Sequence, residues 1–420
     1  MLNKLAPRVD GLGLSIAITA MSLTSPLVAQ TVVSGGGNAL QAAINNASPG
    51  DVLSVLMADY DAITVDRSIT IEFDAGATVT GSGQPALTVQ NIASSETVRI
   101  RGGLFRQGAI QTAPVTLIQQ IDGTVFLSAT QGNTDRSSVP SGGVMTIQSS
   151  PLGRIVIEEA DVSQTGLGLD LSTIRVESCD DVRFQDCPGL SSLEFVNSNV
   201  VLVDCVVSSQ LAQPNQTVIP YAMRVENSNV EVSGGTYWTP RGFFDELANG
   251  SAVSVTDNSS VVRATGGTRF IKTGIFVVPP GTLPALSGPQ TAFQIDASVD
   301  LVDPLPITSH FTATSIPSIR SPQSMVPNQL DLEFRGESNQ LVFGLLGTPT
   351  TPFDTPVGRI WAENLVPFIA LSIPTGQTSV TTSLGIPPLL PPNLELTLQV
   401  VIPTPTNQFE TSPPLCVVLP

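Results

Sequence analysis

The densest group of side chains that could carry chemistry lies between residues 180 and 186. Asp180 and Asp181 are followed by Arg183 and then by Asp186. Two carboxyl groups that flank a sugar can hydrolyse a glycosidic bond, one as the acid and the other as base or nucleophile. Asp181, Arg183 and Asp186 are therefore the catalytic candidates. The alternative is that these charges only face solvent.

The same carboxylates are the candidates for a calcium site. Calcium binds several oxygens that converge on one point, whereas consecutive residues of a strand point to opposite faces. Only carboxylates from different segments can meet, such as Asp161 or Glu159 with Asp181 and Asp186. We expect no cofactor other than calcium, and none at all if these side chains do not converge.

A second candidate site is the aromatic-rich segment from Thr236 to Glu246. Aromatic residues make up only 5% of the chain, yet this segment holds four of them together with an arginine and two acids. Aromatic rings can pack on the apolar faces of a ligand while polar groups fix its orientation. Tyr237, Trp238, Arg241 and Asp245 are therefore predicted to bind a carbohydrate. Alternatively, the rings only cover the flank of the domain.

Other chemistries find little support. The only histidine is His310, which lies in a proline-rich stretch, and no serine has a nucleophile motif around it. The chain has 35 acidic and 18 basic residues, a net charge of −17. Nucleic acid is excluded as a partner because its phosphates require a concentrated basic face. Polysaccharides and cell-surface components remain the expected partners.

Residues 1–29 have the pattern of a signal peptide. Lys4 and Arg8 supply a positive start, Leu12 to Leu27 is mostly apolar, and Ala29 is a plausible cleavage point. No later stretch is long and apolar enough to span a bilayer. The sequence therefore predicts a secreted or cell-surface protein with no transmembrane segment in the mature chain.

A repeat positions the candidate residues. Alternating apolar residues are followed by a small or acidic pair, as in Val98-Arg99-Ile100 before Gly102-Gly103. The second residue of the pair recurs at steps of 18 to 32 residues, at Gly76, Gly103, Thr130, Ala160, Cys187, Cys205, Gly235 and Gly267. Short strands repeated at this period indicate a solenoid in which each unit buries its apolar edge against its neighbours. Asn197 and Asn227, each before a strand, are predicted to stack as a structural ladder.

The start of this repeat resembles a known superfamily. Residues Leu40 to Val55 read LQAAINNASPGDVLSV, with an amphipathic helix over Asn38 to Ala47, and they are similar to the opening of secreted right-handed parallel β-helix proteins of the pectate-lyase-like superfamily. The resemblance implies an N-terminal helix that caps the solenoid. For a lyase of this superfamily it also implies an arginine base, for which Arg154, Arg175, Arg183 and Arg224 are candidates, beside calcium-binding carboxylates.

The cysteines are interpreted through the same repeat. Cys187 and Cys205 occupy equivalent positions in successive units. Neighbouring strands lie about 4.8 Å apart, which is within the Cα separation of a disulfide. A Cys187–Cys205 disulfide is possible in an exported protein. Cys179 competes as a partner, and reduced thiols stacked in a dry core are the alternative.

The composition changes after Gly274, since 23 of the 34 prolines lie between Pro279 and Pro420. We predict a parallel β-helix over 30–303, a proline-rich linker over 304–327 and an antiparallel β-sandwich over 328–420, because short apolar runs recur there between Pro and Gly. This tail resembles C-terminal modules of large exported bacterial proteins at Gly358-Arg359-Ile360-Trp361, Ile386-Pro387 and Leu394 to Gln399.

The expected protein is an exported all-β solenoid. The leading hypothesis is a non-catalytic surface for glycan or cell-surface contact, with the tail as an attachment or assembly module. The alternative is a polysaccharide lyase or glycoside hydrolase that acts on an acidic polysaccharide over the middle of the solenoid. A spacer that binds nothing is the third.

Overall fold

The computed structural model describes most of the chain from Gln30 onward. The described ranges are 30–108, 113–134, 144–162, 173–208, 221–239, 250–272, 284–302, 309–321, 329–355, 358–386, 394–404 and 409–418. The predicted signal peptide lies outside these ranges, and so do Arg241 and Asp245. No helix in the described part of the chain is long and apolar enough to cross a membrane.

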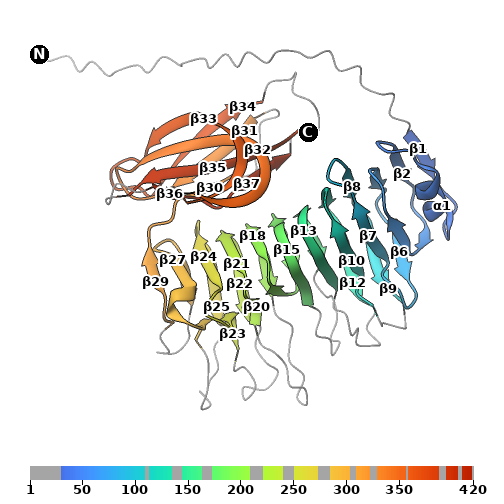
Figure 1. Cartoon of the computed structure of the whole chain (residues 1–420), viewed down its shortest axis with the longest axis horizontal. Helices are drawn as coiled ribbons and strands as arrows, with labels where there is room; N and C mark the ends of the chain where they lie inside the picture. Colours follow the sequence, from blue (N-terminus) through green and yellow to red (C-terminus); the bar gives the residue numbers. More distant parts are fainter. Residues whose placement is uncertain are drawn as a thin grey trace, which may run out of the picture.

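Parallel strands form a solenoid with three ladders (Figure 1), and a complete coil contributes one strand to each ladder. The first ladder holds β4 (Ile63–Val65), β7 (Leu87–Ile92), β10 (Thr116–Ile121), the first parts of β13 (Met145–Glu158) and β15 (Thr173–Gln185), β17 (Ser192–Val196), β20 (Tyr221–Glu226), β23 (Ser251–Val255) and β26 (Leu286–Ser287). The predicted all-β solenoid is confirmed. The handedness that the resemblance implies stays a prediction.

The second ladder follows in each coil. It holds β1 (Gln30–Val33), β2 (Val52–Val55), β5 (Thr70–Phe73), β8 (Thr97–Arg101), β11 (Thr124–Ser128), the second parts of β13 and β15, β18 (Asn199–Val203), β21 (Asn229–Ser233), β24 (Val261–Thr265), β27 (Phe293–Asp296) and β29 (Thr312–Thr314). A 3-10 turn, η1 (Gln290–Ala292), precedes β27.

The third ladder completes the coils. It holds β3 (Asp59–Asp61), β6 (Thr78–Gly81), β9 (Leu104–Gln107), β12 (Gln131–Thr134), β14 (Asp161–Val162), β16 (Gly189–Leu190), β19 (Val206–Ser208), β22 (Thr236–Thr239), β25 (Arg269–Lys272) and β28 (Asp300–Val302). Inward side chains of all three ladders form one continuous apolar core. Stacked coils bury their apolar edges in this way, and no coil has a core of its own.

Helix α1 (Ala39–Asn46) lies at the first coil, where the sequence places a helix. Leu40 and Ile44 are fully buried in the solenoid core, one helical turn apart on the same face. Gln41 on the same helix accepts a 2.6 Å hydrogen bond from the backbone N–H of Thr64. The helix thus contributes apolar side chains to the end of a core that would otherwise meet water.

From β7 to β22, successive coils turn through left-handed backbone at two corners. Between the first and second ladders the turn residues are Asn91, Gln120, Ser149, Ser178, Asn197 and Asn227. Between the second and third ladders they are Gly102, Ala129, Glu159, Asp186, Asp204, Gly234 and Gly266. The second set contains the small or acidic residue of the sequence repeat, which confirms that the repeat marks how the chain turns.

Side chains at these corners connect successive coils. The Asn227 amide donates to Asn197 Oδ1 at 2.7 Å, and the Asn229 amide donates to Asn199 Oδ1 at 2.9 Å. The structural asparagine ladder predicted from the repeat is therefore confirmed. Inside the corner, the backbone N–H of Ser198 donates to Ser228 Oγ at 3.0 Å. Both sets of contacts satisfy turn groups that would otherwise need water.

All four cysteines are free and buried. Cys187 and Cys205 do lie in successive coils, since the Val206 N–H donates to the Cys187 carbonyl. Each thiol instead donates to main-chain carbonyls, Cys187 Sγ to Gln185 O at 3.4 Å and Cys205 Sγ to Val203 O at 3.3 Å. The disulfide is not formed, and the stacked reduced thiols are the arrangement found.

Two antiparallel sheets follow the solenoid and form what we call the C-terminal unit. One sheet holds β30 (Ser318–Arg320), β31 (Gln329–Arg335) and β34 (Ser379–Gly385), and the other holds β32 (Leu341–Thr355), β33 (Gly358–Ser372), β35 (Glu395–Pro403), β36 (Phe409–Thr411) and β37 (Leu415–Val418). Side chains of both sheets share one core. The connection is shorter than predicted, because β29 still pairs with the solenoid and β30 already pairs with β31.

The C-terminal unit packs on the second ladder of the solenoid rather than standing apart from it (Figure 1). Val201 and Val203 point outward from β18 and belong to the same apolar cluster as Trp361 and Leu398 of the unit. Phe126 and Val156 likewise contact Cys416. We call the outward residues Phe126, Arg154, Val156, Asp181, Arg183, Val201 and Val203 the docking face.

Replacing Val201 by aspartate tests this packing, because Val201 is 1% exposed beneath the unit. A buried unpaired charge should lower the free energy of unfolding by about 3 kcal/mol or more. The control is Val206→Asp in the same coil, where the side chain is 38% exposed and the change should stay within about 0.5 kcal/mol. Chemical denaturation and limited proteolysis of the unit are the measurements. Equal stability of the two variants would contradict the packing.

Candidate functional site

The predicted catalytic pair lies under the C-terminal unit. Asp181 and Arg183 are 1% and 2% exposed. Arg183 Nε donates to Asp181 Oδ1 at 2.7 Å and Nη2 donates to Oδ2 at 3.1 Å. The guanidinium also lies 5.3 Å from the ring of Trp361. A polysaccharide cannot reach this pair, so the predicted groove over the middle coils is wrong at this position and the two residues serve the docking face.

Arg154 extends the same buried network. Its guanidinium pairs with Asp181 at 3.3 Å and with Glu395 of the unit. Burial, with a further contribution from Arg183, lowers the pKa of Arg154 to about 10. The thiol of Cys416 donates to Glu395 Oε1 at 2.9 Å, and burial raises its pKa. The charge on Arg154 is therefore neutralised within the docking interface and is unavailable as a base for an external substrate.

The predicted calcium ligands do not converge. Asp181 begins the second part of β15 and Asp186 directly follows the strand, five residues away or about 16 Å along a strand. Asp161 lies on β14 in the third ladder, opposite Gly189. In the described ranges, no three His, Cys, Asp or Glu side chains form a group that could hold a metal. The proposed calcium site at Asp161, Asp181 and Asp186 is thus not assembled.

The aromatic segment divides between core and surface. Tyr237 is fully buried, with its ring 5.4 Å from that of Phe270, and burial raises the pKa of its hydroxyl well above the usual value. Its prediction as a ligand contact is wrong because it packs inside the solenoid. Trp238 is half-buried on β22 beside Ser208 and Ile271. Arg241 and Asp245 lie outside the described residues.

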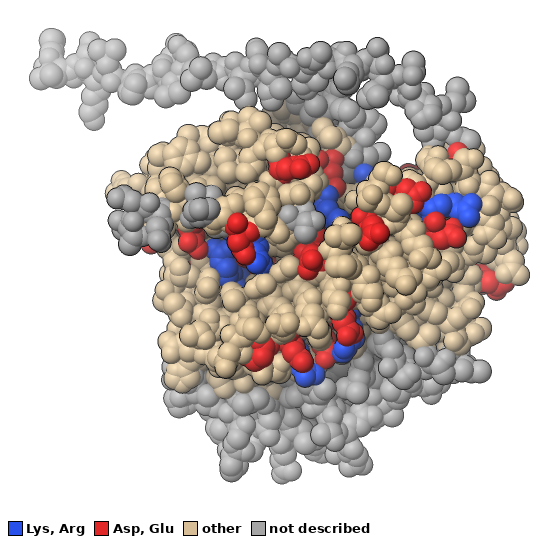
Figure 2. All heavy atoms as spheres, in the orientation of Figure 1, with Lys and Arg blue, Asp and Glu red and all other residues tan. Residues whose placement is uncertain are grey.

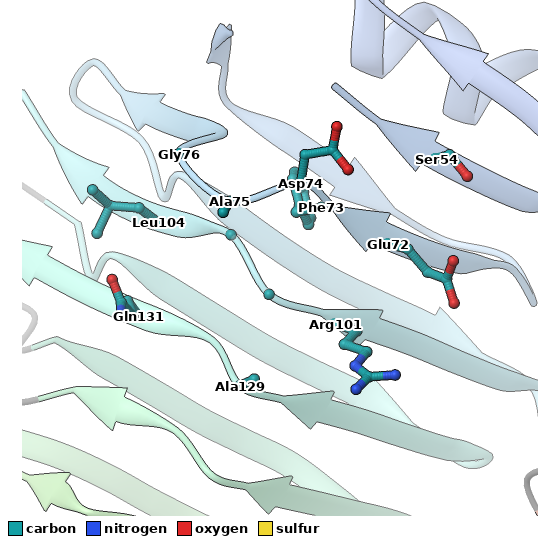
Figure 3. Close-up of a pocket in the computed structure, with 12 residues that line it drawn as sticks. Ser54, Glu72, Phe73, Asp74, Ala75, Gly76, Arg101, Leu104, Ala129 and Gln131 are labelled. Atoms are coloured by element: carbon teal, nitrogen blue, oxygen red, sulfur yellow. The ribbon is translucent and has the colours of Figure 1, made fainter. Parts of the chain in front are cut away.

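An open groove lies at the corner between the second and third ladders of the N-terminal coils (Figure 3). Its volume is about 640 Å³. We call it the corner groove, and its lining residues are Ser54, Glu72, Phe73, Asp74, Ala75, Gly76, Arg101, Gly102, Gly103, Leu104, Ala129 and Gln131. These residues come from consecutive coils, so the groove runs across the stacked strands.

Small residues at the corner leave the space open. Gly102 and Ala129 occupy the left-handed position in these coils, where the following coils carry Glu159, Asp186 and Asp204. A Cβ at Gly103 would lie 3.0 Å from the ring of Phe73, which is closer than side chains normally pack. Small residues at this corner therefore leave room for the groove, whereas the next three coils carry longer acidic residues there.

Polar side chains project into the groove from one column of the second ladder. Ser54, Glu72 and Arg101 line the groove and are paired in register from β2 to β8, about 4.8 Å apart per coil. Ser128 on β11 continues the column beyond the lining residues. In Figure 3, Glu72 and Arg101 extend from neighbouring strands toward the same side. Among the residues that the structure describes, Arg101 forms no ion pair. Its donors are thus available to a ligand.

The other wall supplies a carboxylate and an aromatic ring. Asp74 follows β5 and is exposed, and within the described part of the chain neither Asp74 nor Glu72 has an ion-pair partner. Phe73 is half-buried and its ring packs edge-on against Phe105 at 5.6 Å. The groove therefore combines hydrogen-bond acceptors, donors and an apolar surface, which is the lining of an orienting ligand site.

Acidic residues continue the column beyond the groove. Glu158 pairs in register with Ser128. Burial, with the neighbouring carboxylates of Glu159 and Asp186, raises its pKa to about 7. Partial desolvation and the carboxylate of Asp204 raise the pKa of Asp186 to about 6. Sequence reasoning selected Asp186 but missed the groove itself, for which the switch from small to acidic corner residues was the available signal.

Comparisons with known proteins show no family. No protein-family model matches the chain, and no curated protein matches it. Among solved structures, the chain is similar to the enzymatically active domain of tailspike protein 2 of bacteriophage CBA120, with 10% identity and a TM-score of 0.39. The similarity covers 92% of this chain and 76% of that one. A TM-score at this level says nothing about activity.

The raised pKa of Glu158 predicts a pH-dependent effect on stability. Between about pH 4.5 and about pH 7 the folded state holds a proton that the unfolded state releases, so stability falls as the pH rises through this range. Glu158→Gln should therefore raise the free energy of unfolding at pH 8 by roughly 1–3 kcal/mol and have little effect at pH 5. Denaturant titrations at both pH values measure this.

The control for that titration is Glu363→Gln, at an exposed position on β33. It should leave the free energy of unfolding unchanged at both pH values. A Glu158→Gln variant that is destabilised at pH 8 would show that the ionised carboxylate is stabilised by its surroundings, contrary to the expectation.

Proposed function

We propose that this protein is an exported solenoid that binds a glycan in the corner groove, without catalysing a reaction. The observation that carries the proposal is the groove itself, about 640 Å³ and lined by Glu72, Asp74, Arg101 and the ring of Phe73. Carboxylates accept hydrogen bonds from sugar hydroxyls, guanidinium groups donate to them, and an aromatic ring offers an apolar face. Export rests on the signal-like pattern of residues 1–29 and remains part of the proposal.

The first ladder is a weaker candidate because its outward side chains satisfy one another. The Gln119 amide donates to Gln90 at 3.1 Å, and Gln148 donates to Gln119 at 3.0 Å. Further along, Glu194 pairs with both Arg175 and Arg224. On the face shown in Figure 2, acidic and basic side chains also lie side by side. Binding a ligand there would first break these contacts, whereas the ionic groups of the groove have no such partners to lose.

The C-terminal unit is proposed to hold the solenoid rigid and to leave its own outer surface for attachment. Its inner side is occupied by the docking face, and Arg359 donates to Asn199 at 3.1 Å while Arg263 pairs with Glu410 at 2.8 Å. An attachment role would therefore use the outer strands of the unit. Deleting the unit would expose Val201 and Val203, so its role is better tested by surface substitutions than by truncation.

Glycoside hydrolysis is the second candidate function. Glu158 and Asp186 have pKa values raised to about 7 and about 6, and a carboxyl group that stays protonated near neutral pH can act as a general acid. Release of reducing ends from any glycan that binds, lost in Glu158→Gln and declining above about pH 7, would support this function. If the bound glycan stays intact after prolonged incubation, hydrolysis is ruled out and binding is the function that remains.

Alanine substitution of Arg101 tests the proposed function. A charged donor that bonds a sugar contributes about 1.5–3 kcal/mol, so Arg101→Ala should weaken glycan binding roughly 10- to 100-fold. The control is Arg106→Ala on the neighbouring strand β9, where the guanidinium pairs with the exposed Asp59 and does not line the groove. A glycan array followed by calorimetry gives the affinities. Equal loss in both variants, or loss in neither, would remove the groove as the contact.

A further inference from the structure

We infer that the corner groove selects neutral, hydroxyl-rich saccharide units and discriminates against uronic acids. This inference rests on the proposed function, since it concerns the ligand class of the same groove. It goes against the acidic polysaccharide that the sequence suggested. The selectivity follows from the unpaired charges in and around the groove and from what each offers to a sugar.

The unpaired charges in the groove are mainly negative. Glu72 and Asp74 lack ion-pair partners among the described residues, and so does Arg101. Beyond Ser128, Glu158 continues the same outward column. The groove therefore contains two carboxylates and one guanidinium, and further acidic residues lie at its end.

Neighbouring arginines do not restore the balance. Arg99 lies with its guanidinium 4.1 Å from the ring of Phe126, on the docking face. Arg106 pairs with Asp59 at 3.3 Å, and Arg320 of the C-terminal unit pairs with Asp204 at 3.0 Å through its Nε. These cations are already engaged, so Arg101 is the cation in the groove that a sugar carboxylate would meet.

A uronate would meet repulsion together with attraction. If its carboxylate bonds Arg101, it lies within one coil spacing, about 4.8 Å, of the Glu72 position. Like charges about 4 Å apart repel by roughly 1–4 kcal/mol at a protein surface, which offsets much of the attraction to Arg101. The net charge of −17 adds a long-range repulsion of anionic polymers at low salt.

A neutral sugar meets neither penalty. Its hydroxyl groups can donate to Glu72 and Asp74 and accept from Arg101, because each hydroxyl is both donor and acceptor. Both signs of charge in the groove are then satisfied by the same chemical group. An amino sugar would be attracted by Glu72 and Asp74 but repelled by Arg101. Neutral sugar units therefore match all three charged groups best.

Matched polymer pairs test this selectivity. Pectate, alginate and hyaluronan are each compared with their carboxyl-reduced forms, which keep the linkages and replace each uronate by a neutral sugar. We expect at least one reduced polymer to bind about 10-fold tighter than its parent or better. Its affinity should change less than about twofold between about 50 and about 500 mM salt, since contacts to a neutral sugar are not screened by salt.

Charge-neutral variants identify the cause. The double substitution Glu72→Gln with Asp74→Asn should strengthen binding of the parent uronate polymer. It should thereby reduce the difference in affinity between the parent polymer and its carboxyl-reduced form. Glu363→Gln with Asp122→Asn removes the same charge from exposed positions outside the groove and should leave this difference unchanged. Preferential binding of the parent polymers, lost in Arg101→Gln, would overturn the inference while the proposed function stands. Binding of amino-sugar polymers ahead of neutral ones would also overturn it.

Failure of the proposed function has a different signature. In that case no reduced or parent polymer, and no glycan on the array, binds in a way that Arg101→Ala weakens. The inference then falls together with the function on which it rests.

Discussion

The structure depends on one constraint, which is the left-handed backbone that successive coils from β8 to β25 adopt where the second ladder turns into the third. For residues other than glycine this conformation costs about 1–2 kcal/mol, yet Ala129, Glu159, Asp186 and Asp204 all adopt it. Hydrogen bonds from their N–H groups to the next coil hold each of them in place. Because the turn is identical in successive coils, its side chains project at the same place along the solenoid.

Because the turn repeats from coil to coil, the residue at the corner decides which surface each coil presents. With Gly102 and Ala129 the corner is hollow, and with Glu159, Asp186 and Asp204 it becomes an acidic wall. On the other side of the turn, the residue types at the outward positions of the second ladder likewise decide what lies on them. Where they are apolar, as at Val156 and Val201, the C-terminal unit covers them. The corner groove of the N-terminal coils is lined by solenoid residues and is not covered by the unit.

Much of the fold could be predicted from the sequence, because short strands, small corner pairs and the Asn197–Asn227 ladder are local patterns. The docking of the C-terminal unit also leaves a signal in the sequence. Val201 and Val203 are apolar at outward positions of β18, where the alternation predicts polar residues. The partner of these residues could not be named, because packing between segments some two hundred residues apart leaves no periodic signal. Asp181 and Arg183 were predicted to be catalytic because charged residues are dense around them in the sequence. That density does not reveal that both side chains are buried.

The candidate site was harder to predict than the scaffold. Glu72, Asp74 and Arg101 are separated along the chain and each is an ordinary surface residue by itself. Only the register of β5 with β8 places Glu72 beside Arg101, and only the small residues after them open the space. A groove formed where side chains are small leaves only one trace in the sequence, the switch from small to acidic corner residues, so its recognition required the stacked coils.

The most direct test of the account fills the groove without changing its charge. Ala129→Gln should lower glycan affinity 10-fold or more, by order of magnitude, and leave the melting temperature unchanged, because Gln120 already adopts the same left-handed backbone at the other corner. The control is Ser149→Gln, at an exposed left-handed position away from the groove, and it should bind as the unmodified protein does. Undiminished binding by a folded Ala129→Gln variant would contradict the central claim that the corner groove is the binding site.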